Sequence, residues 1–150
     1  MKNKKSFQQA ISETPDIHNC FKSGLQALGA HASKISLADP RVCNGSLEID
    51  KNTRPIYPND HRWDYAFSYN KDVFFVEVHG AKSDEISTME DKLKWLKAWL
   101  HHHAPEINKL KHPKTPFYWI QSNGYHIINN AKYNRRIAQL GLKPIAKLIL

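Results

Sequence analysis

The segment 62–81 constrains the fold of this chain more than any other part of the sequence. It reads RWDYAFSYNKDVFFVEVHGA, and its aromatic and β-branched residues predict two strands, 62–69 and 72–80. Only Asn70 and Lys71 separate the two strands, which is short enough for a hairpin turn, although Asn-Gly is the favoured pair there. The segment therefore predicts an antiparallel hairpin.

Side chains alternate between the two faces of a strand, and this alternation brings acids together. Glu77 shares its face with Phe75 and His79, although apolar residues surround it in the sequence. An unpaired carboxylate there is costly, so a cation, a basic side chain or hydrogen bonds must compensate it. Asp64 on the first strand is expected to face the same pocket. The opposite face of that strand carries four aromatic residues: Trp63, Tyr65, Phe67 and Tyr69.

The other segments predict helices and strands around this hairpin. Thr14 and Pro15 are typical of a helix start, and apolar residues recur at helical spacing over 15–28. The longest apolar stripe predicts a helix over 83–103. Further expected elements are strands at 46–50, 116–121 and 143–150, a helix at 130–140 and a loop at 51–61. This order is typical of an α/β fold with a central mixed β-sheet flanked by helices.

Composition narrows the class of protein. The 150 residues, 41% of them hydrophobic and 24% charged, predict a single globular domain over 1–150, with 1–13 as a basic lead-in. No run of about 18 apolar residues is present, and the basic start lacks the apolar core of a signal peptide. The two cysteines, Cys20 and Cys43, are too few for a disulfide scaffold, so we expect reduced thiols in a cytoplasmic protein.

The net charge indicates the kind of partner. The 22 Lys and Arg residues against 14 Asp and Glu residues give a charge of +8, which favours nucleic acid before an anionic membrane. The basic residues expected to bind nucleic acid are Lys82, Lys132, Arg135 and Arg136. We expect DNA or RNA as the partner, and no membrane.

The order of elements around the two acids resembles the PD-(D/E)xK superfamily of nucleases, whose core is a restriction-endonuclease-like αβββαβ arrangement. The resemblance covers residues 14–121. The RWDY, VEVH and KLKWLKAWL patterns at 62–65, 76–79 and 92–100 are also similar to uncharacterised bacterial proteins. The resemblance implies that Asp64 and Glu77 are catalytic and bind Mg²⁺ or Mn²⁺. Two carboxylates about one strand spacing apart suit such a hard cation.

This chain departs from the family because His79 stands where Lys is usual. The resemblance implies that the lysine orients or deprotonates the attacking water and stabilises negative charge. His79 can act as a base near neutral pH or as a metal ligand. Lys92, beside the apolar stripe of its helix, is a candidate for a lysine that has moved to another element, with Lys82 as a second candidate. We therefore expect four catalytic residues: Asp64, Glu77, His79 and Lys92.

Four other residues are candidates for supporting roles. Glu48 or Asp50 on the preceding strand, or Glu13 near the first helix, could add a metal ligand. Gln121 could orient substrate or water at the end of the next strand.

Each of these residues also has a structural interpretation. Asp64 and Glu77 could pair with Arg62 or a lysine, His79 could be a hydrogen-bonded residue at a sheet edge, and Lys92 could lie on a solvated helix flank. The basic residues could form an exposed face without a ligand.

The aromatic and histidine residues of the helix 83–103 are open to similar alternatives. Trp95 and Trp99 are expected to pack against the sheet, with a partner or base-stacking surface as the alternative. Three consecutive histidines, 101–103, cannot chelate one ion together, because consecutive helix residues point in different directions.

The sequence therefore favours a small metal-dependent nuclease that acts on DNA or RNA. Many nucleases of the family that it resembles work as dimers, so the resemblance is also compatible with a homodimer. The alternative is a catalytically degenerate protein of the same fold that binds nucleic acid or a protein without cleaving. A third hypothesis is an adaptor that binds a protein partner through Trp95 and Trp99.

Overall fold

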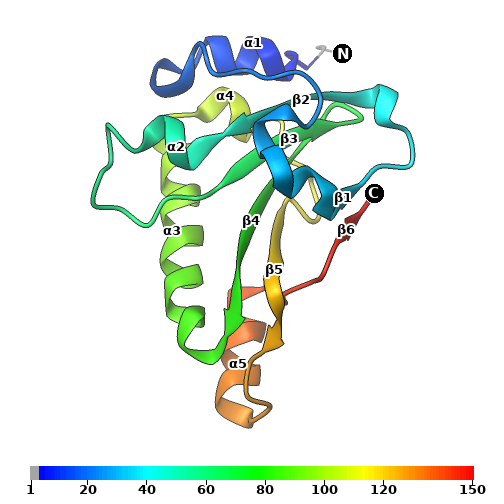
Figure 1. The fold of residues 1–150 in the computed structure, drawn as a ribbon. Helices are drawn as coiled ribbons and strands as arrows, with labels where there is room; N and C mark the ends of the chain where they lie inside the picture. Colours follow the sequence, from blue (N-terminus) through cyan, green and yellow to red (C-terminus); the bar gives the residue numbers. More distant parts are fainter. Residues whose placement is uncertain (1–3) are drawn as a thin grey trace.

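A four-stranded sheet forms the centre of the molecule, which the computed structural model describes over residues 4–150 (Figure 1). The strands lie in the order β2 (Cys43–Glu48), β3 (Tyr65–Tyr69), β4 (Asp72–Lys82) and β5 (Phe117–His126). The first three are antiparallel neighbours, and β5 runs parallel to β4. The predicted α/β fold, with a mixed sheet flanked by helices, is confirmed.

The β3–β4 hairpin turns at Asn70 and Lys71, as the sequence predicts. Their φ angles are 50° and 70°, the left-handed conformation that the favoured two-residue hairpin turn requires at both positions. The register places Tyr65 opposite Val76, so β3 begins close to the middle of the longer β4. This register decides which residues meet at the open end of the hairpin.

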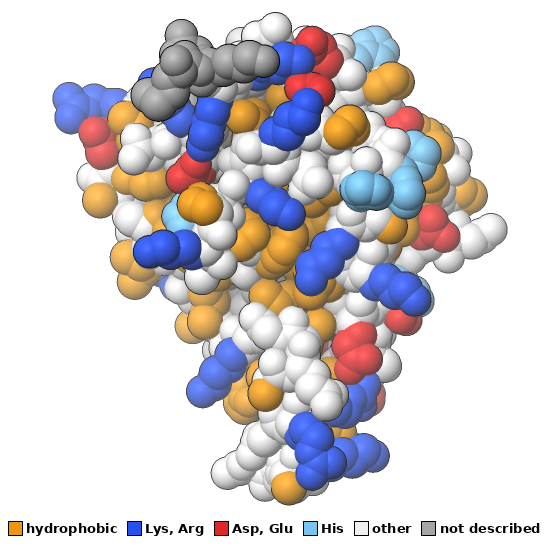
Figure 2. All heavy atoms as spheres, turned by 180° about the vertical axis from the view of Figure 1, so that it is seen from behind, with side chains coloured by type: hydrophobic (Ala, Val, Ile, Leu, Met, Phe, Trp, Pro, Cys, Tyr) orange, Lys and Arg blue, Asp and Glu red, His pale blue; other side chains and the backbone are white. Residues whose placement is uncertain are grey.

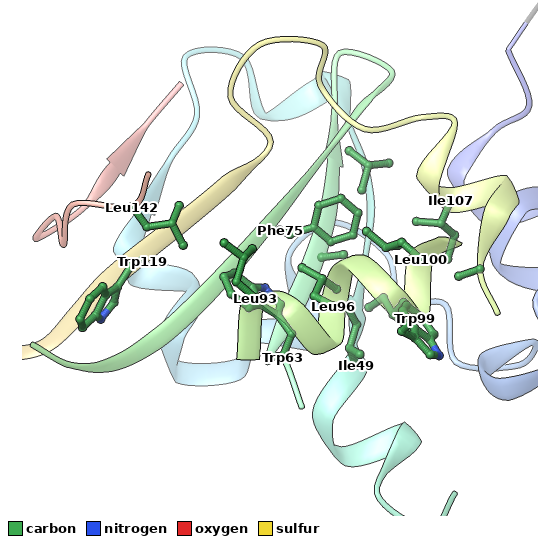
Figure 3. Close-up of a cluster of buried hydrophobic side chains, with 14 of the residues drawn as sticks. Ile49, Trp63, Phe75, Leu93, Leu96, Trp99, Leu100, Ile107, Trp119 and Leu142 are labelled. Atoms are coloured by element: carbon green, nitrogen blue, oxygen red, sulfur yellow. The ribbon is translucent and has the colours of Figure 1, made fainter. Parts of the chain in front are cut away.

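The α-helices described in residues 4–150 cover one face of the sheet, here called the α3 face. They are α1 (Phe7–Ser12), α2 (Ile49–Thr53), α3 (Ile86–His102), α4 (Pro105–Asn108) and α5 (Ala131–Leu140). The short 3-10 segment η4 (Ser83–Glu85) leads into α3. Figure 3 shows Leu93 and Leu96 of α3 close to Trp63, with Phe75 of the sheet nearby.

The opposite face, here called the η2 face, carries a smaller apolar cluster. It is covered by the 3-10 segment η2 (Gln26–Lys34) and the paired parallel strands β1 (Ile35–Ser36) and β6 (Leu148–Ile149). Leu28, Ile35 and Leu148 pack there against Phe74 and Val76. The alternation predicted for β4 is confirmed, since Phe75 belongs to the cluster on the α3 face.

The helix expected over 15–28 is not formed. Pro15–Ile17 makes one 3-10 turn, η1, and Lys22 then pairs with Ser46 beside β2. Gly24 follows with φ of 48°, a left-handed conformation that ends a right-handed helix. The chain regains helical turns only in η2, so the predicted helix is replaced by two short segments and an edge pairing.

Residues expected as a basic lead-in contribute to the core instead. Ser6 caps α1 by accepting a hydrogen bond from the Gln9 N–H, and Phe7, Ala10 and Ile11 are buried. The apolar spacing is helical, but α1 has only six residues, too few for a clear pattern. Residues 1–3 of the expected lead-in lie outside the described residues.

Several boundaries also differ from the expected ones. β2 begins at Cys43, α2 occupies the start of the expected loop 51–61, and β5 continues through Asn123 and Gly124. The last expected strand, 143–150, reduces to β6, with one separate bridge between Ile145 and Ile120.

Trp63 is predicted to share a face with three other aromatic residues of the hairpin, but it points to the opposite side of the sheet. It packs on the α3 face, whereas Tyr65, Phe67 and Tyr69 pack on the η2 face. The strand alternation begins only at Tyr65, so it does not apply to residue 63.

None of the helices in the described part of the chain combines the length and apolar character needed to cross a membrane.

Candidate functional site

Asp64 and Glu77 lie at the open end of the β3–β4 hairpin. The Asp64 N–H donates to Glu77 Oε1 at 3.0 Å, and the Val78 N–H donates to Asp64 Oδ2 at 3.1 Å. β3 begins one residue after Asp64, so this carboxylate accepts the hydrogen bond that a backbone carbonyl would accept in a longer strand. The two acids that the sequence places in one pocket are therefore hydrogen-bonded into one unit.

Lys92 joins this unit from α3. Its Nζ lies 3.1 Å from Glu77 Oε2 and donates to the Arg62 carbonyl oxygen at 3.0 Å. The Glu77 side chain is 1% exposed and that of Lys92 is 14% exposed. Lys92 thus lies beside the apolar stripe of α3, as the spacing predicts, and the interpretation as a solvated helix flank does not fit. We call Asp64, Glu77 and Lys92 the acid–lysine cluster.

The charge of Glu77 is only partly compensated. Burial raises the pKa of its carboxyl well above the ordinary value of 4.5, and the negative charge of Asp64 raises it further. The Lys92 ammonium opposes both effects and lowers this pKa. The site therefore contains a buried acid whose ionised form requires a positive charge nearby.

His79 takes part in a separate contact. Its Nε2 lies 2.8 Å from Glu85 Oε2 in η4, and the Trp119 Nε1–H donates to its backbone carbonyl at 3.2 Å. The half-buried ring of His79 is therefore bound to Glu85, whereas Lys92 contacts Glu77 directly. The structure brings Lys92, rather than His79, onto the acid.

Two of the acids expected to add a metal ligand lie beside the cluster. The Ile49 N–H donates to the Asp64 carbonyl oxygen at 2.8 Å, which attaches the junction of β2 and α2 to the cluster. Glu48 and Asp50 flank that junction. Asp50 Oδ1 accepts a hydrogen bond from Arg62 Nε at 2.8 Å, so this carboxylate is committed to an ion pair.

Glu13 and Gln121 lie outside the cluster. Glu13 pairs with Lys5 at 3.0 Å. Gln121 is the register partner of His79 on β5, and its backbone carbonyl accepts a hydrogen bond from Lys34 Nζ at 3.5 Å.

Tyr65 is a neighbour of the cluster that the sequence did not single out. Its hydroxyl lies 2.9 Å from His31 Nδ1 on the η2 face. Burial first, and then the charges of surrounding acids, raise its pKa to about 12, so the phenol stays protonated at neutral pH. Those acids are Asp64, Glu48, Glu77 and Asp50. The available signal was the position of Tyr65 directly after Asp64.

The predicted nucleic-acid-binding residues lie away from the cluster. Lys82 is exposed at the end of β4, and Lys132 and Arg135 are exposed on α5. Arg136 is half-buried, and its Nη2 lies 2.9 Å from Glu90 Oε1. Figure 1 shows α5 at the end of the molecule where β4 ends and α3 begins.

The two α3 tryptophans are engaged within the chain. Their rings stack with centroids 5.7 Å apart. Trp99 Nε1 donates to Asp16 Oδ2 and Trp95 Nε1 donates to Asp60 Oδ2, each at 3.1 Å. Trp99 is buried, so the interpretation of these residues as packing residues is confirmed for it.

Within residues 4–150, no three His, Cys, Asp or Glu side chains converge closely enough to hold a metal ion by themselves. Comparison of the chain with protein-family models, with curated proteins and with solved structures gives no significant match. The geometry of the acid–lysine cluster is therefore the main evidence for a function.

Proposed function

We propose that this protein is a metal-dependent nuclease that hydrolyses phosphodiester bonds of DNA or RNA at the acid–lysine cluster. The observation that carries the proposal is the contact of Lys92 with Glu77 at 3.1 Å. The nuclease superfamily that the sequence resembles uses two acids and a lysine. In this chain His79 stands where the superfamily has its lysine, two residues after Glu77, and Lys92 of α3 would supply the ammonium instead.

The donor set fits Mg²⁺ or Mn²⁺ with Asp64 and Glu77 as the protein ligands. Mg²⁺ is commonly bound by one or two carboxylates together with substrate phosphates and water, so a third protein ligand is not required. The raised pKa of Glu77 supports this fit, because Lys92 compensates the charge of its ionised form only in part. When bound, the cation would neutralise phosphate charge and lower the pKa of an attacking water.

The chain's own residues would orient the acids and supply charge. The Asp64 N–H fixes one oxygen of Glu77, and the Val78 N–H fixes one oxygen of Asp64. Donors that are held in place before the reaction cost no reorganisation when charge develops. Lys92 would hold Glu77 ionised and stabilise negative charge on the phosphate. His79 Nε2 is held by Glu85, so its other ring nitrogen, Nδ1, would be the atom that acts as a base.

The basic residues would hold the nucleic-acid backbone. Lys82, Lys132 and Arg135 are exposed and could contact phosphates, whereas Arg136 would first have to leave Glu90. The free thiols of Cys20 and Cys43 favour action in the cytoplasm. A homodimer is part of the same proposal and is tested by light scattering.

One observation favours the alternative, a nuclease-like protein that binds nucleic acid or a protein partner without cleaving it. Glu77 is 1% exposed, and both of its carboxylate oxygens already have partners in the fold. An acid satisfied in this way can serve the structure alone. The alternative therefore predicts nucleic-acid binding or protein binding without cleavage.

A cleavage assay separates the two. Single- and double-stranded DNA and RNA are incubated with the protein in Mg²⁺, Mn²⁺ or EDTA, and the Asp64→Asn variant is compared with Asp72→Asn. Asp72 belongs to the same hairpin but pairs with Lys4 at its far end, so it is a matched control. We expect metal-dependent cleavage that falls at least about a hundredfold in Asp64→Asn and is retained in Asp72→Asn.

Two results would contradict the proposed nuclease activity. Equal cleavage by both variants would place the activity elsewhere or in a contaminant. Absence of cleavage with every metal, by protein whose circular dichroism shows it folded, would leave the non-cleaving alternative.

A further inference from the structure

The α3 face contains a cleft of about 390 Å³ next to the acid–lysine cluster. Its walls come from α3, from the loop that enters β5 and from the segment after α5. Six of the residues that line it are Leu93, Lys97, Lys114, Phe117, Trp119 and Lys143. None of the six belongs to the acid–lysine cluster, and none is Lys82, Lys132, Arg135 or Arg136.

The rim of this cleft is positively charged. Lys97, Lys114 and Lys143 are exposed, and within residues 4–150 none of them forms an ion pair. None of the described residues that line the cleft is an acid. Figure 2 shows the α3 face with a patch of hydrophobic side chains near its middle and Lys and Arg side chains around it. This charge complements a polyanion.

The floor of the cleft is apolar and aromatic. Phe117 is half-buried, and its ring is held by Phe75 and Trp63, with centroids 5.6 and 6.4 Å away. Lys97 Nζ lies 5.5 Å from the centre of the same ring. Figure 3 shows Trp119 and Leu142, two more lining residues, near one another at the side of the core.

From these observations we infer that the cleft binds an unpaired nucleotide of single-stranded nucleic acid. A base would lie on the Phe117 floor, and its flanking phosphates would contact the three lysines. Bases stack on aromatic side chains without regard to sequence, and lysines follow the backbone. The volume is at the lower end of small-ligand sites, which suits one nucleotide and not a duplex, whose bases are already paired and stacked.

The position of the cleft relates it to the acids. Trp119 is the register partner of Glu77, and Leu93 follows Lys92 in α3. Neighbouring strands lie about 4.8 Å apart, so a nucleotide in the cleft would be one strand away from the acid-bearing strand. The role of this strand as the substrate rests on the proposed nuclease, whereas its binding does not.

Binding is measured by fluorescence polarisation with the Asp64→Asn protein in EDTA, so that no cleavage is needed. The probe is a labelled oligothymidylate of about eight nucleotides, compared with an abasic strand and a duplex of the same length. The cleft variant carries Lys97→Gln, Lys114→Gln and Lys143→Gln. The control carries Lys22→Gln, Lys51→Gln and Lys71→Gln, the same loss of charge at exposed lysines outside the cleft.

We expect the single strand to bind more tightly than the duplex, and the abasic strand to bind about tenfold more weakly. The cleft variant should lose at least about tenfold in affinity, and its slope of log K against log salt should be about 2 units smaller in magnitude, about 0.7 for each lysine. The control should keep both the affinity and the slope of the parent.

Three results would overturn the inference: equal losses in the two triple variants, tighter binding of the duplex, or equal binding of the abasic strand. Because these measurements use no metal and a variant without the Asp64 carboxylate, they do not depend on the cleavage assay. Binding without cleavage would support nucleotide binding by the cleft and contradict the proposed nuclease activity. Cleavage without this binding would support the nuclease activity and contradict nucleotide binding by the cleft.

Discussion

At the scale of single residues, the acid–lysine cluster depends on one buried carboxylate and its partners. Glu77 lies in an apolar strand, and its two oxygens contact the Asp64 N–H and Lys92 Nζ. Removing one partner of a buried ion pair leaves an uncompensated charge, which is more costly than replacing both partners. The protonation of Glu77 therefore couples the chemistry of the cluster to the stability of the fold.

This coupling predicts a pH-dependent effect of Glu77→Gln. The raised pKa means that the folded state binds a proton more tightly than the unfolded chain. The stabilisation from that proton is complete below the ordinary pKa of 4.5 and is lost as the pH rises towards the raised value. Glutamine does not titrate, so the stability of Glu77→Gln relative to the wild type should increase as the pH rises from about 4.5 to about 8. Urea unfolding in EDTA measures the difference, and a difference independent of pH would contradict the raised pKa.

Lys92→Met should show the opposite pH dependence, because it removes the cation and keeps the carboxyl group. Lys92 lowers the pKa of Glu77, so its removal should extend the pH range over which the folded state keeps the proton. We expect a loss of about 3 kcal/mol at about pH 8, because the buried partner then lacks its cation. The loss should shrink near the ordinary pKa, where Glu77 is protonated in either protein.

At the scale of elements, the β3–β4 hairpin sets the positions of both acids. Its turn places Lys71 at φ of 70°, a conformation that costs a residue with a Cβ atom roughly 1–2 kcal/mol. Asn70 precedes it, and Asn-Gly is the favoured sequence for this turn. The hairpin therefore keeps the correct register with a strained residue in its turn.

Replacing that residue should stabilise the hairpin. Lys71→Gly is expected to raise the free energy of unfolding by about 1 kcal/mol, less than the full strain because glycine also gains freedom in the unfolded chain. Lys71→Ala is the matched control, because it removes the same side chain but keeps the Cβ atom. Thermal unfolding of the two variants gives the comparison. Equal melting temperatures would show that the turn is not strained.

The elements also show what the sequence can and cannot predict. Period-two and helical spacing found the hairpin, α3 and α5, because each buries one continuous apolar face. Spacing failed over 15–28, where Gly24 adopts positive φ and Lys22 pairs with the edge of β2. Helical periodicity carries no information about such a change of direction. In α1 the helix is too short to show a clear helical periodicity.

The same two kinds of spacing predicted only part of the candidate site. Alternation placed Glu77 towards the α3 face, and helical spacing placed Lys92 beside the apolar stripe. The bond between the Val78 N–H and Asp64 depends on where β3 begins, and the contact of His79 with Glu85 depends on the turn η4. The cleft requires α3, β5 and the segment after α5 to meet, which no local pattern reveals.

At the scale of the whole molecule, two apolar clusters share one sheet. The four tryptophans, Trp63, Trp95, Trp99 and Trp119, all belong to or pack against the cluster on the α3 face. The cluster on the η2 face contains tyrosines and phenylalanines instead. Tryptophan fluorescence therefore reports on one side of the sheet only, while far-ultraviolet circular dichroism reports on both.

This asymmetry gives a test of whether the molecule unfolds as one unit. Leu28 is 2% exposed on the η2 face, and Leu28→Ala should cost about 3 kcal/mol there. Because β3 and β4 carry side chains of both clusters, we expect the tryptophan transition to fall by about 6–12 °C together with the circular dichroism transition. Ile149→Ala, at a 74% exposed position of β6, is the control and should change little. If the tryptophan transition stayed at the wild-type temperature in Leu28→Ala while the circular dichroism curve split, the η2 side would unfold separately, and the acid–lysine cluster would not depend on it.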